Sequence, residues 1–215
     1  MLGDTVVVNV GERAYQKSFT VHRGILCFYS GYFEAALNGK FSEANNGVVE
    51  LREETVDTFE RFVFWLYTRK YDAATTSADG FHSICELWLF ADRRQVPLLA
   101  NVMINAMRDG IVKHWIVPTN EVELIYNNTT EGPPLRQFIV WVISNTIPAS
   151  EAMNPKGRAA LWPAEFLRDI LKSVWTLRDS GSKRLSKQEV ANVDMCTFHQ
   201  HEEGVKCPVR DGAET

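Results

Sequence analysis

Residues 19–67 decide the fold, and they read FTVHRGILCFYSGYFEAALNGKFSEANNGVVELREETVDTFERFVFWLY. A β-rich run ends at His22, and helical patterns begin at Arg23 and again near Ser30. A loop rich in Asn and Gly then leads to a short strand at residues 48–51 and to a strongly apolar helix. The stretch contains no reactive constellation of side chains, so it favours a binding surface over a catalyst.

The alternation of strand and helix continues on both sides of this stretch. The β-branched run 5–10 predicts a buried strand that pairs as a hairpin with residues 14–21. Further strands and helices are predicted at 57–69 (a helix buried on most sides), 68–71 (a short strand), 81–91 (a helix) and 97–110 (a helix from Pro97 to Gly110).

A change of composition follows residue 112. Shorter helices are predicted to begin at Pro118, at Pro133 and at Trp162, the last of them carrying apolar residues up to Val174. From Arg178 onward the chain is polar and poor in large apolar residues, which predicts a mobile tail.

The composition is that of a soluble globular protein, with 45% apolar and 23% charged residues in a chain of 215. A net charge of −4 argues against direct nucleic-acid binding, and no apolar run is long enough for a membrane span. Charged residues within the first twenty argue against a signal peptide, so the four cysteines point to a reducing, cytoplasmic or nuclear compartment. The basic residues that we judge too scattered for a nucleic-acid stripe are Arg61, Arg69, Lys70, Arg93 and Arg94.

Several of these motifs, taken in order, resemble the core signature of BTB/POZ domains. The residues that carry the resemblance are FTVHR at 19–23, Ile25, Leu26, Ser30, Tyr32, Phe33 and ERFVFWLYT at 60–68. The chain is most similar to fungal BTB proteins, in which the domain precedes a few helices and a short tail. The implied α+β fold is a small, mostly antiparallel sheet with a cluster of helices at 1–112, then an all-helical extension at 113–177. A polar, mostly irregular tail at 178–215 completes the predicted organisation.

The resemblance implies a protein–protein interaction module that often forms homodimers and has no catalytic activity. Family members frequently act as substrate adaptors for cullin-RING ubiquitin ligases, and some cullin-binding members carry a hydrophobic-x-Glu motif before the third strand. Phe41, Ser42 and Glu43 stand at that place. One apolar knob would fill a pocket of the cullin while the carboxylate fixes its orientation. In the alternative interpretation, Phe41 packs on its own core and Glu43 is solvated.

The dimer and the client surface follow less directly from the resemblance. Asp4 and Arg23 match positions where the family often has a charged pair near the dimer interface; a structural ion pair or a solvated face is the alternative. The sequence starts almost at the first strand, which argues against a dimer with exchanged N-terminal segments. An adaptor would have to hold its client through residues 113–215. The alternative function is a nuclear scaffold or transcriptional regulator that acts through partner proteins.

The tail contains the motif whose residue types are most typical of metal ligands, with the spacing C-x2-H-x-H-x5-C. Its members are Cys196, His199, His201 and Cys207. Two thiolates and two imidazoles suffice for a closed tetrahedral zinc site, and a metal would supply folding energy to a segment with almost no core. The alternative is a peripheral strand or loop in which Cys196 and Phe198 pack on the body. No other cofactor is expected.

Other reactive residue types have structural interpretations. His22 lacks partners for a triad and is predicted to make a structural hydrogen bond. Cys27 and Cys85 lie in apolar helical patterns and are predicted to be buried thiols. The acidic residues around the strand at 48–51 are interpreted as solvated partners of a helix dipole, and they are Glu50, Glu53, Glu54 and Glu60. We therefore predict neither an enzyme nor a small-molecule substrate.

Overall fold

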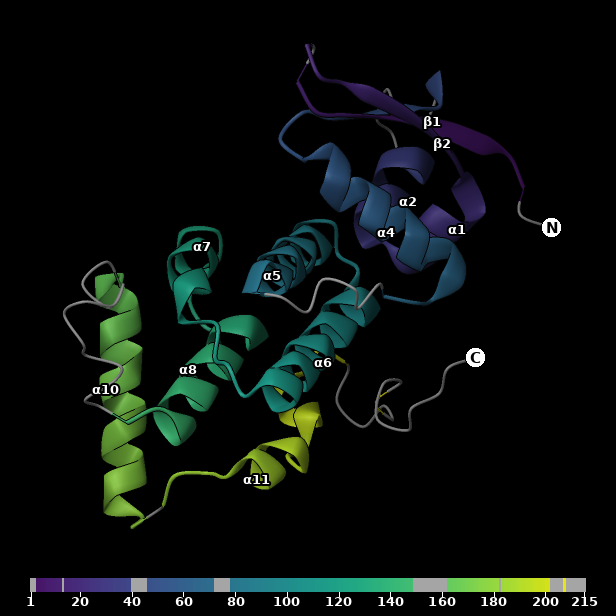
Figure 1. Cartoon of the computed structure of the whole chain (residues 1–215). Helices are drawn as coiled ribbons and strands as arrows, with labels where there is room; N and C mark the ends of the chain where they lie inside the picture. Colours follow the sequence, from purple (N-terminus) through teal and green to yellow (C-terminus); the bar gives the residue numbers. More distant parts are fainter. Residues whose placement is uncertain are drawn as a thin grey trace.

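The computed structural model places a small sheet at one end of the molecule and a stack of helices below it (Figure 1). It describes residues 3–12, 14–39, 46–71, 78–148, 162–181, 183–201 and 207. In the described part of the chain, no helix has both the length and the apolar character that crossing a membrane requires.

The sheet has three strands among the described residues, in the order β2-β1-β3. β1 (Thr5–Val10) and β2 (Lys17–His22) form the predicted antiparallel hairpin, while β3 (Val48–Leu51) joins β1 in parallel. The sheet is therefore mixed rather than mostly antiparallel, because a crossover that includes α1 and α2 separates β2 from β3 and brings the chain back in the direction of β1. Alternate valines of β1 are buried, which seats one face of the sheet on the helices.

Three helices cover the sheet: α1 (Arg23–Tyr29), α2 (Gly31–Asn38) and α4 (Val56–Thr68). Ser30 caps α2 as predicted, because its hydroxyl accepts a hydrogen bond from the Phe33 backbone at 3.1 Å. In α4, Phe59, Phe62, Trp65 and Leu66 are fully buried.

The prediction that α4 is buried on most sides is wrong, since Phe64 and Tyr67 are exposed on its outer face. The strand predicted at 68–71 does not form either. Instead, α4 is capped by Arg69 in the left-handed conformation, with its guanidinium 3.5 Å from the centroid of the Tyr29 ring.

Two long helices form the centre of the molecule, α5 (Ala78–Arg93) and α6 (Pro97–His114). Pro97 lies in the first turn of α6 as predicted. Gly110 does not end α6. It packs against α5, where an added Cβ would stand 3.1 Å from the Phe81 ring. The glycine therefore serves close helix packing, and α6 continues by one more turn.

The described part of the extension consists of η2 (Thr119–Glu121), α7 (Val122–Asn127), α8 (Pro134–Thr146) and α10 (Ala164–Asp179). Its buried residues, such as Ile125, Phe138 and Phe166, belong to the same hydrophobic cluster as those of the sheet. One core therefore runs from β1 to the extension without a polar boundary.

The described tail residues differ from the mobile segment that the sequence predicts. α11 (Lys187–Ala191) and η4 (Met195–Phe198) follow α10 and lie against the lower part of α6 (Figure 1). Phe198 is buried, with its ring centroid 5.3 Å from Phe138 and 5.6 Å from Trp141. Phe198 thus anchors, together with the buried Val190 and Met195, a segment that is otherwise mostly polar.

Candidate functional site

The predicted cullin-binding motif, Phe41-Ser42-Glu43, lies outside the described residues. Its flanks are described: α2 is capped by Gly39 on one side, and β3 begins at Val48 on the other. The motif is therefore predicted to lie in the connection between α2 and the sheet, and its role stays a prediction.

Asp4 and Arg23 meet through the backbone. The Arg23 amide donates to the Asp4 carbonyl oxygen at 2.8 Å, which ties the start of α1 to the start of β1. The Arg23 guanidinium turns to the end of α2, where it donates to Asn38 Oδ1 at 2.7 Å and to the Leu37 carbonyl. In the described part of the chain, no ion pair joins the two side chains, so Arg23 acts as a brace between α1 and α2.

His22 makes the structural hydrogen bond that the sequence predicts. Its Nδ1 lies 2.7 Å from Tyr67 Oη, and the same hydroxyl accepts from the His22 backbone amide at 3.1 Å. These bonds fix the junction of β2 and α1 to α4. Of the two cysteines predicted to be buried, Cys85 is fully buried, and burial raises the pKa of its thiol. Cys27 is partly exposed.

Exposed aromatic rings mark the surface of the sheet-containing part. Phe28 on α1 is 78% exposed although its neighbour Tyr29 packs inward against Trp65. Tyr15, at the far end of the β1–β2 hairpin, is 85% exposed. The Phe28 ring contacts Tyr29 at 4.7 Å between centroids but stays largely in solvent, so Phe28 is a candidate contact residue for a partner.

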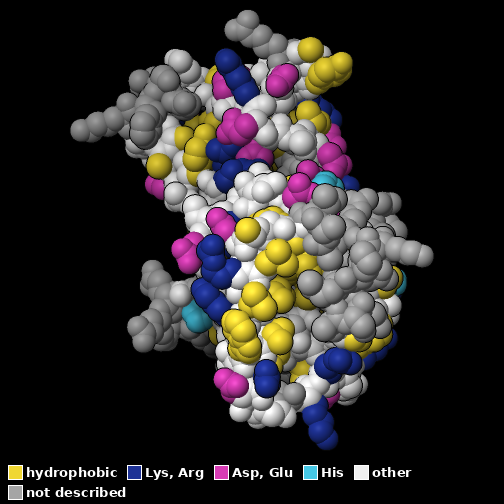
Figure 2. Space-filling model, turned by 90° about the vertical axis from the view of Figure 1, so that its left-hand side faces the viewer, with side chains coloured by type: hydrophobic (Ala, Val, Ile, Leu, Met, Phe, Trp, Pro, Cys, Tyr) yellow, Lys and Arg dark blue, Asp and Glu magenta, His cyan; other side chains and the backbone are white. Residues whose placement is uncertain are grey.

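A second exposed apolar surface lies on α10. Leu171, Val174 and Trp175 follow one another at helical spacing and face away from the body. Figure 2 shows hydrophobic side chains gathered on this side of the molecule, with Lys and Arg side chains along one edge. Exposed Arg168 and Lys172 belong to α10. We call the three apolar residues the α10 stripe.

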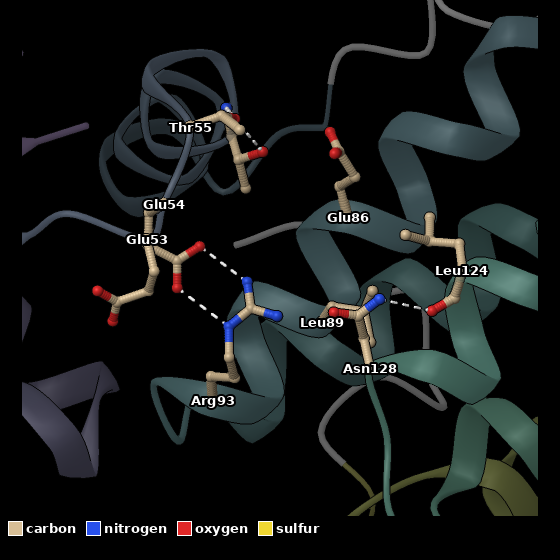
Figure 3. A pocket seen from close by; sticks show the side chains of 9 residues that line it. Glu53, Glu54, Thr55, Glu86, Leu89, Arg93, Leu124 and Asn128 are labelled. Atoms are coloured by element: carbon tan, nitrogen blue, oxygen red, sulfur yellow. Dashed lines mark hydrogen bonds and ion pairs between the residues drawn. The ribbon is translucent and has the colours of Figure 1, made fainter. Parts of the chain in front are cut away.

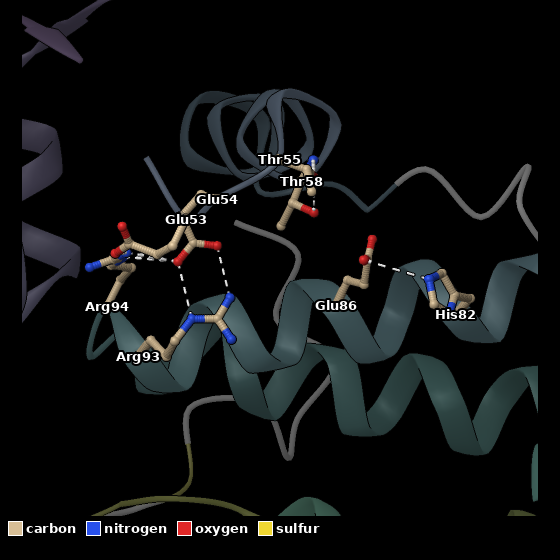
Figure 4. Close-up of polar contacts among 8 residues, drawn as sticks. All are labelled: Glu53, Glu54, Thr55, Thr58, His82, Glu86, Arg93 and Arg94. Atoms are coloured by element: carbon tan, nitrogen blue, oxygen red, sulfur yellow. Dashed lines mark hydrogen bonds and ion pairs between the residues drawn. The ribbon is translucent and has the colours of Figure 1, made fainter. Parts of the chain in front are cut away.

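A buried ionic cluster joins the loop after β3 to the end of α5 (Figure 4). The Glu54 side chain is only 2% exposed. It accepts two hydrogen bonds from Arg93, at 3.1 and 2.8 Å, and two from Arg94, at 3.2 and 2.8 Å. Arg94 also donates to Glu53 at 2.5 Å and lies over the Tyr32 ring at 4.6 Å.

The predicted interpretation of the acidic residues as solvated helix-dipole partners is therefore wrong for Glu54. Its charge is neutralised by two guanidinium groups, which also argues against a pair of carboxylates for acid–base work. The hydrogen bond from Arg94 holds the pKa of Glu53 below its usual range. Local sequence patterns contain no signal of this cluster, because about 40 positions separate the partners.

A cleft of about 300 Å³ opens beside this cluster (Figure 3). Residues from α4, α5 and α7 line it, so the cleft lies between the sheet-containing part and the extension. Its polar side chains include Arg93, already paired with Glu54, and Glu86, which lies 3.5 Å from His82 (Figures 3 and 4). Both contacts lie on α5 and the loop after β3, while Leu89 and Leu124 add apolar lining to the cleft.

The four tail residues predicted as metal ligands come together in space. His201 Nε2 lies 3.0 Å from Cys196 Sγ, and His199 Nδ1 lies 3.0 Å from Cys207 Sγ. Ligand atoms of Cys196, His201 and Cys207 all lie within 4.8 Å of one another. Cys207 is buried, whereas His201 is exposed, so the cluster is open to solvent at His201.

Residues of α6 hold this cluster in place. Asn105 Oδ1 lies 2.9 Å from His199 Nε2, so the amide oxygen accepts the ring N–H and leaves Nδ1 free of a proton. Asn101, which is buried, pairs with the backbone of Gln200 in both directions, at 2.7 and 2.9 Å. Burial, together with His201, lowers the pKa of His199 to about 4, and its ring is neutral at neutral pH.

The structure has a small mixed sheet packed on a cluster of helices, and His22 and Arg23 fix the helices to the sheet. This arrangement is an α+β domain with exposed apolar side chains on its surface. Residues 4–95 match the family model for the BTB/POZ domain, and this part of the chain is a BTB/POZ domain. The predicted fold class is thereby confirmed.

Two curated relatives match part of the chain. Kelch-like protein 11 from Homo sapiens and Kelch-like protein 11 from Mus musculus are each 34% identical to the chain over 83 residues. The aligned segment is 36% of this chain and 11% of each relative. The chain spans about a tenth of the length of these relatives.

Proposed function

We propose that this protein is a non-enzymatic interaction module that self-associates through its BTB/POZ domain and connects a cullin-RING ubiquitin ligase to a client. The observation that carries the proposal is the BTB/POZ domain at residues 4–95, since such domains are generally interaction modules. Two contacts support the proposal. Glu54 is neutralised by Arg93 and Arg94, and His22 is hydrogen-bonded to Tyr67, so neither side chain is placed to act as an acid or a base.

Self-association is assigned to the surface of α1. Phe28 offers an exposed ring there, Arg23 is the first residue of the same helix, and Asp4 contacts Arg23 from the start of β1. Burying the ring against a second copy would remove apolar area from water, and aromatic residues near the centre of an interface often carry most of its energy. The rigid brace from Arg23 to α2 would hold this surface in one shape before the second copy binds.

Sedimentation velocity over a range of protein concentrations tests the self-association. We expect wild type to form dimers and Phe28→Ser to shift the equilibrium to monomer, with a loss of at least about tenfold in affinity for a ring of this size. Tyr15→Ser is the matched control, because that ring is equally exposed but lies at the other end of the hairpin. A monomeric wild type, or equal effects of both variants, would refute this part.

The cullin contact is assigned to Phe41-Ser42-Glu43 by resemblance. The test is capture of a purified cullin N-terminal domain by the full chain, compared with Phe41→Ala and Glu43→Gln. We expect Phe41→Ala to abolish capture and Glu43→Gln to weaken it, since the carboxylate only orients the knob. No capture by wild type, or capture unaffected by Phe41→Ala, would remove the ligase from the proposal and leave self-association standing.

The client surface is assigned to the α10 stripe. Its apolar residues lie beside exposed Arg168 and Lys172, so the complementary partner is an amphipathic segment with acidic residues along one side. Trp175→Ser should remove a client that wild type retains in affinity purification, while dimerisation is unchanged. Retention of every partner by Trp175→Ser would exclude this surface.

A further inference from the structure

The tail cluster is separate from the surfaces assigned above. We propose that Cys196, His199, His201 and Cys207 bind one Zn²⁺ ion in a tetrahedral site, and that this ion clamps the tail onto α6. The proposed site does not depend on self-association or on cullin binding, so its test is separate from theirs.

The donor atoms lie at nearly the separations that a zinc ion requires. With Zn–S and Zn–N bonds of about 2.3 and 2.0 Å, ligand atoms at the corners of a tetrahedron lie about 3.3–3.8 Å apart. The two Cys–His pairs are at 3.0 Å, and the three ligand atoms of Cys196, His201 and Cys207 lie within 4.8 Å of one another. The ligand atoms of these three residues already lie together, and His199 Nδ1 lies next to Cys207 Sγ, so a rearrangement of side chains would complete the coordination sphere.

The donor set selects the metal. Two thiolates with two imidazoles in a tetrahedral arrangement suit zinc, and four protein ligands leave no position open for catalysis. Binding would break two S–H bonds, and the two protons would leave to solvent while both cysteines become thiolates. The exposed side at His201 provides the path by which the ion enters.

Residues around the cluster hold its ligands in orientations that suit metal binding. Metal-bound imidazoles usually donate their second ring N–H to a protein oxygen, which fixes the tautomer. His199 has this arrangement: Nε2 faces Asn105 Oδ1 at 2.9 Å, and Nδ1 points to Cys207. Asn101 holds the next residue, Gln200, by its backbone, so the ligands on either side of it are fixed relative to α6.

The structural role follows from what the tail buries. η4 places Phe198 between the rings of α8, yet the described tail has few other buried side chains, among them Val190 and Met195. A metal bound to Cys196 and Cys207 would close the chain around that anchor and restrict its unfolded states. Small peripheral segments gain most of their order from such a link.

Metal analysis of the full chain, purified without a histidine tag, tests the site. We expect one equivalent of zinc by inductively coupled plasma mass spectrometry, and loss of that equivalent in Cys196→Ser and in Cys207→Ser. Cys27→Ser, which alters a partly exposed cysteine in α1, is the matched control and should retain zinc. The Co²⁺-loaded protein should show the strong visible absorption of a tetrahedral thiolate site.

The outcomes that would overturn the proposal are equally specific. They are zinc well below one equivalent after reloading, zinc retained by both cysteine variants, or a Cys196–Cys207 disulfide in mass spectra of freshly purified protein. Asn105→Ala provides a readout that leaves all ligands in place: we expect zinc affinity to fall about 10- to 100-fold in chelator competition. Unchanged affinity in that variant would overturn the assigned role of His199 Nδ1.

Hydrogen exchange separates a clamp from a passive site. Removal of zinc from wild type should abolish the protection of the Gln200 amide, which donates to Asn101 Oδ1. Protection that is equal with and without zinc would overturn the clamp.

Discussion

Replacing Glu54 by Gln tests the ionic cluster, because the substitution keeps the shape of the side chain and removes its charge. The Glu54 side chain is 2% exposed, while that of Arg94 is 7% exposed. Removing one partner from a buried ion pair costs about 3–5 kcal/mol in unfolding free energy. The lower end applies here, because the Arg93 side chain is 39% exposed and Arg94 keeps Glu53. We therefore expect a loss of about 3 kcal/mol for Glu54→Gln.

Glu53→Gln is the matched control within the same cluster. The Glu53 side chain is 63% exposed and pairs only with Arg94 among the described residues, so its loss should cost less than about 1 kcal/mol. Urea unfolding followed by circular dichroism measures both variants, and at a slope of about 2–3 kcal/mol/M the midpoint of Glu54→Gln should fall by about 1 M. Equal losses for the two variants, or a midpoint for Glu54→Gln within error of wild type, would refute the assignment of a buried pair.

The remaining predictions concern acid, the cap of α2 and the tail anchor. The folded state lowers the pKa of Glu53, so the contact between Glu53 and Arg94 stabilises the protein above the unfolded pKa of about 4.3. This stabilisation is lost as pH falls through the folded pKa of Glu53. The urea midpoints of wild type and Glu53→Gln should therefore converge in acid, and midpoints that diverge would contradict this. Ser30→Ala should lower the free energy of unfolding in urea by about 2–3 kcal/mol, since it removes the cap of α2 and leaves the Arg94 carbonyl without its donor. Ser186→Ala, which removes the exposed cap of α11, should lower it by less than about 1 kcal/mol. A larger loss for Ser186→Ala than for Ser30→Ala would be inconsistent with the structure. Phe198→Ala should release the tail, so that hydrogen exchange speeds up over residues 195–201 while the sheet stays protected; unchanged exchange there would show that the ring is not the anchor.

The secondary structure of the BTB/POZ domain could be predicted largely from local patterns. The apolar spacing of α4, the β-branched run of β1 and the cap at Ser30 each follow from residues a few positions apart. Gly110 shows the limit of such reasoning, because the local pattern suggests the end of a helix. Only the neighbouring Phe81 ring explains why a glycine stands there and why α6 continues.

The candidate functional residues were likewise predictable only where their signal is local in the sequence. The tail ligands could be proposed because their types and spacing are chemical signals within a dozen residues. The ionic cluster could not, since Glu54 and the two arginines are each unremarkable and meet only when β3 and α5 pack together. Phe28 was also missed: a phenylalanine in an apolar helix predicts burial, and its exposure depends on which face of α1 the sheet covers.

The unbroken core between the sheet and the extension has a mechanical consequence. A hinge needs a layer that can open at little cost, and here a swing of α10 relative to α1 would have to separate packed side chains such as Phe138 from their neighbours. We therefore expect the described part of the chain to act as a rigid spacer. Two partners held at its opposite ends would meet at a distance set by the fold, and the effective concentration of one for the other would be fixed by geometry instead of by the length of a flexible tether.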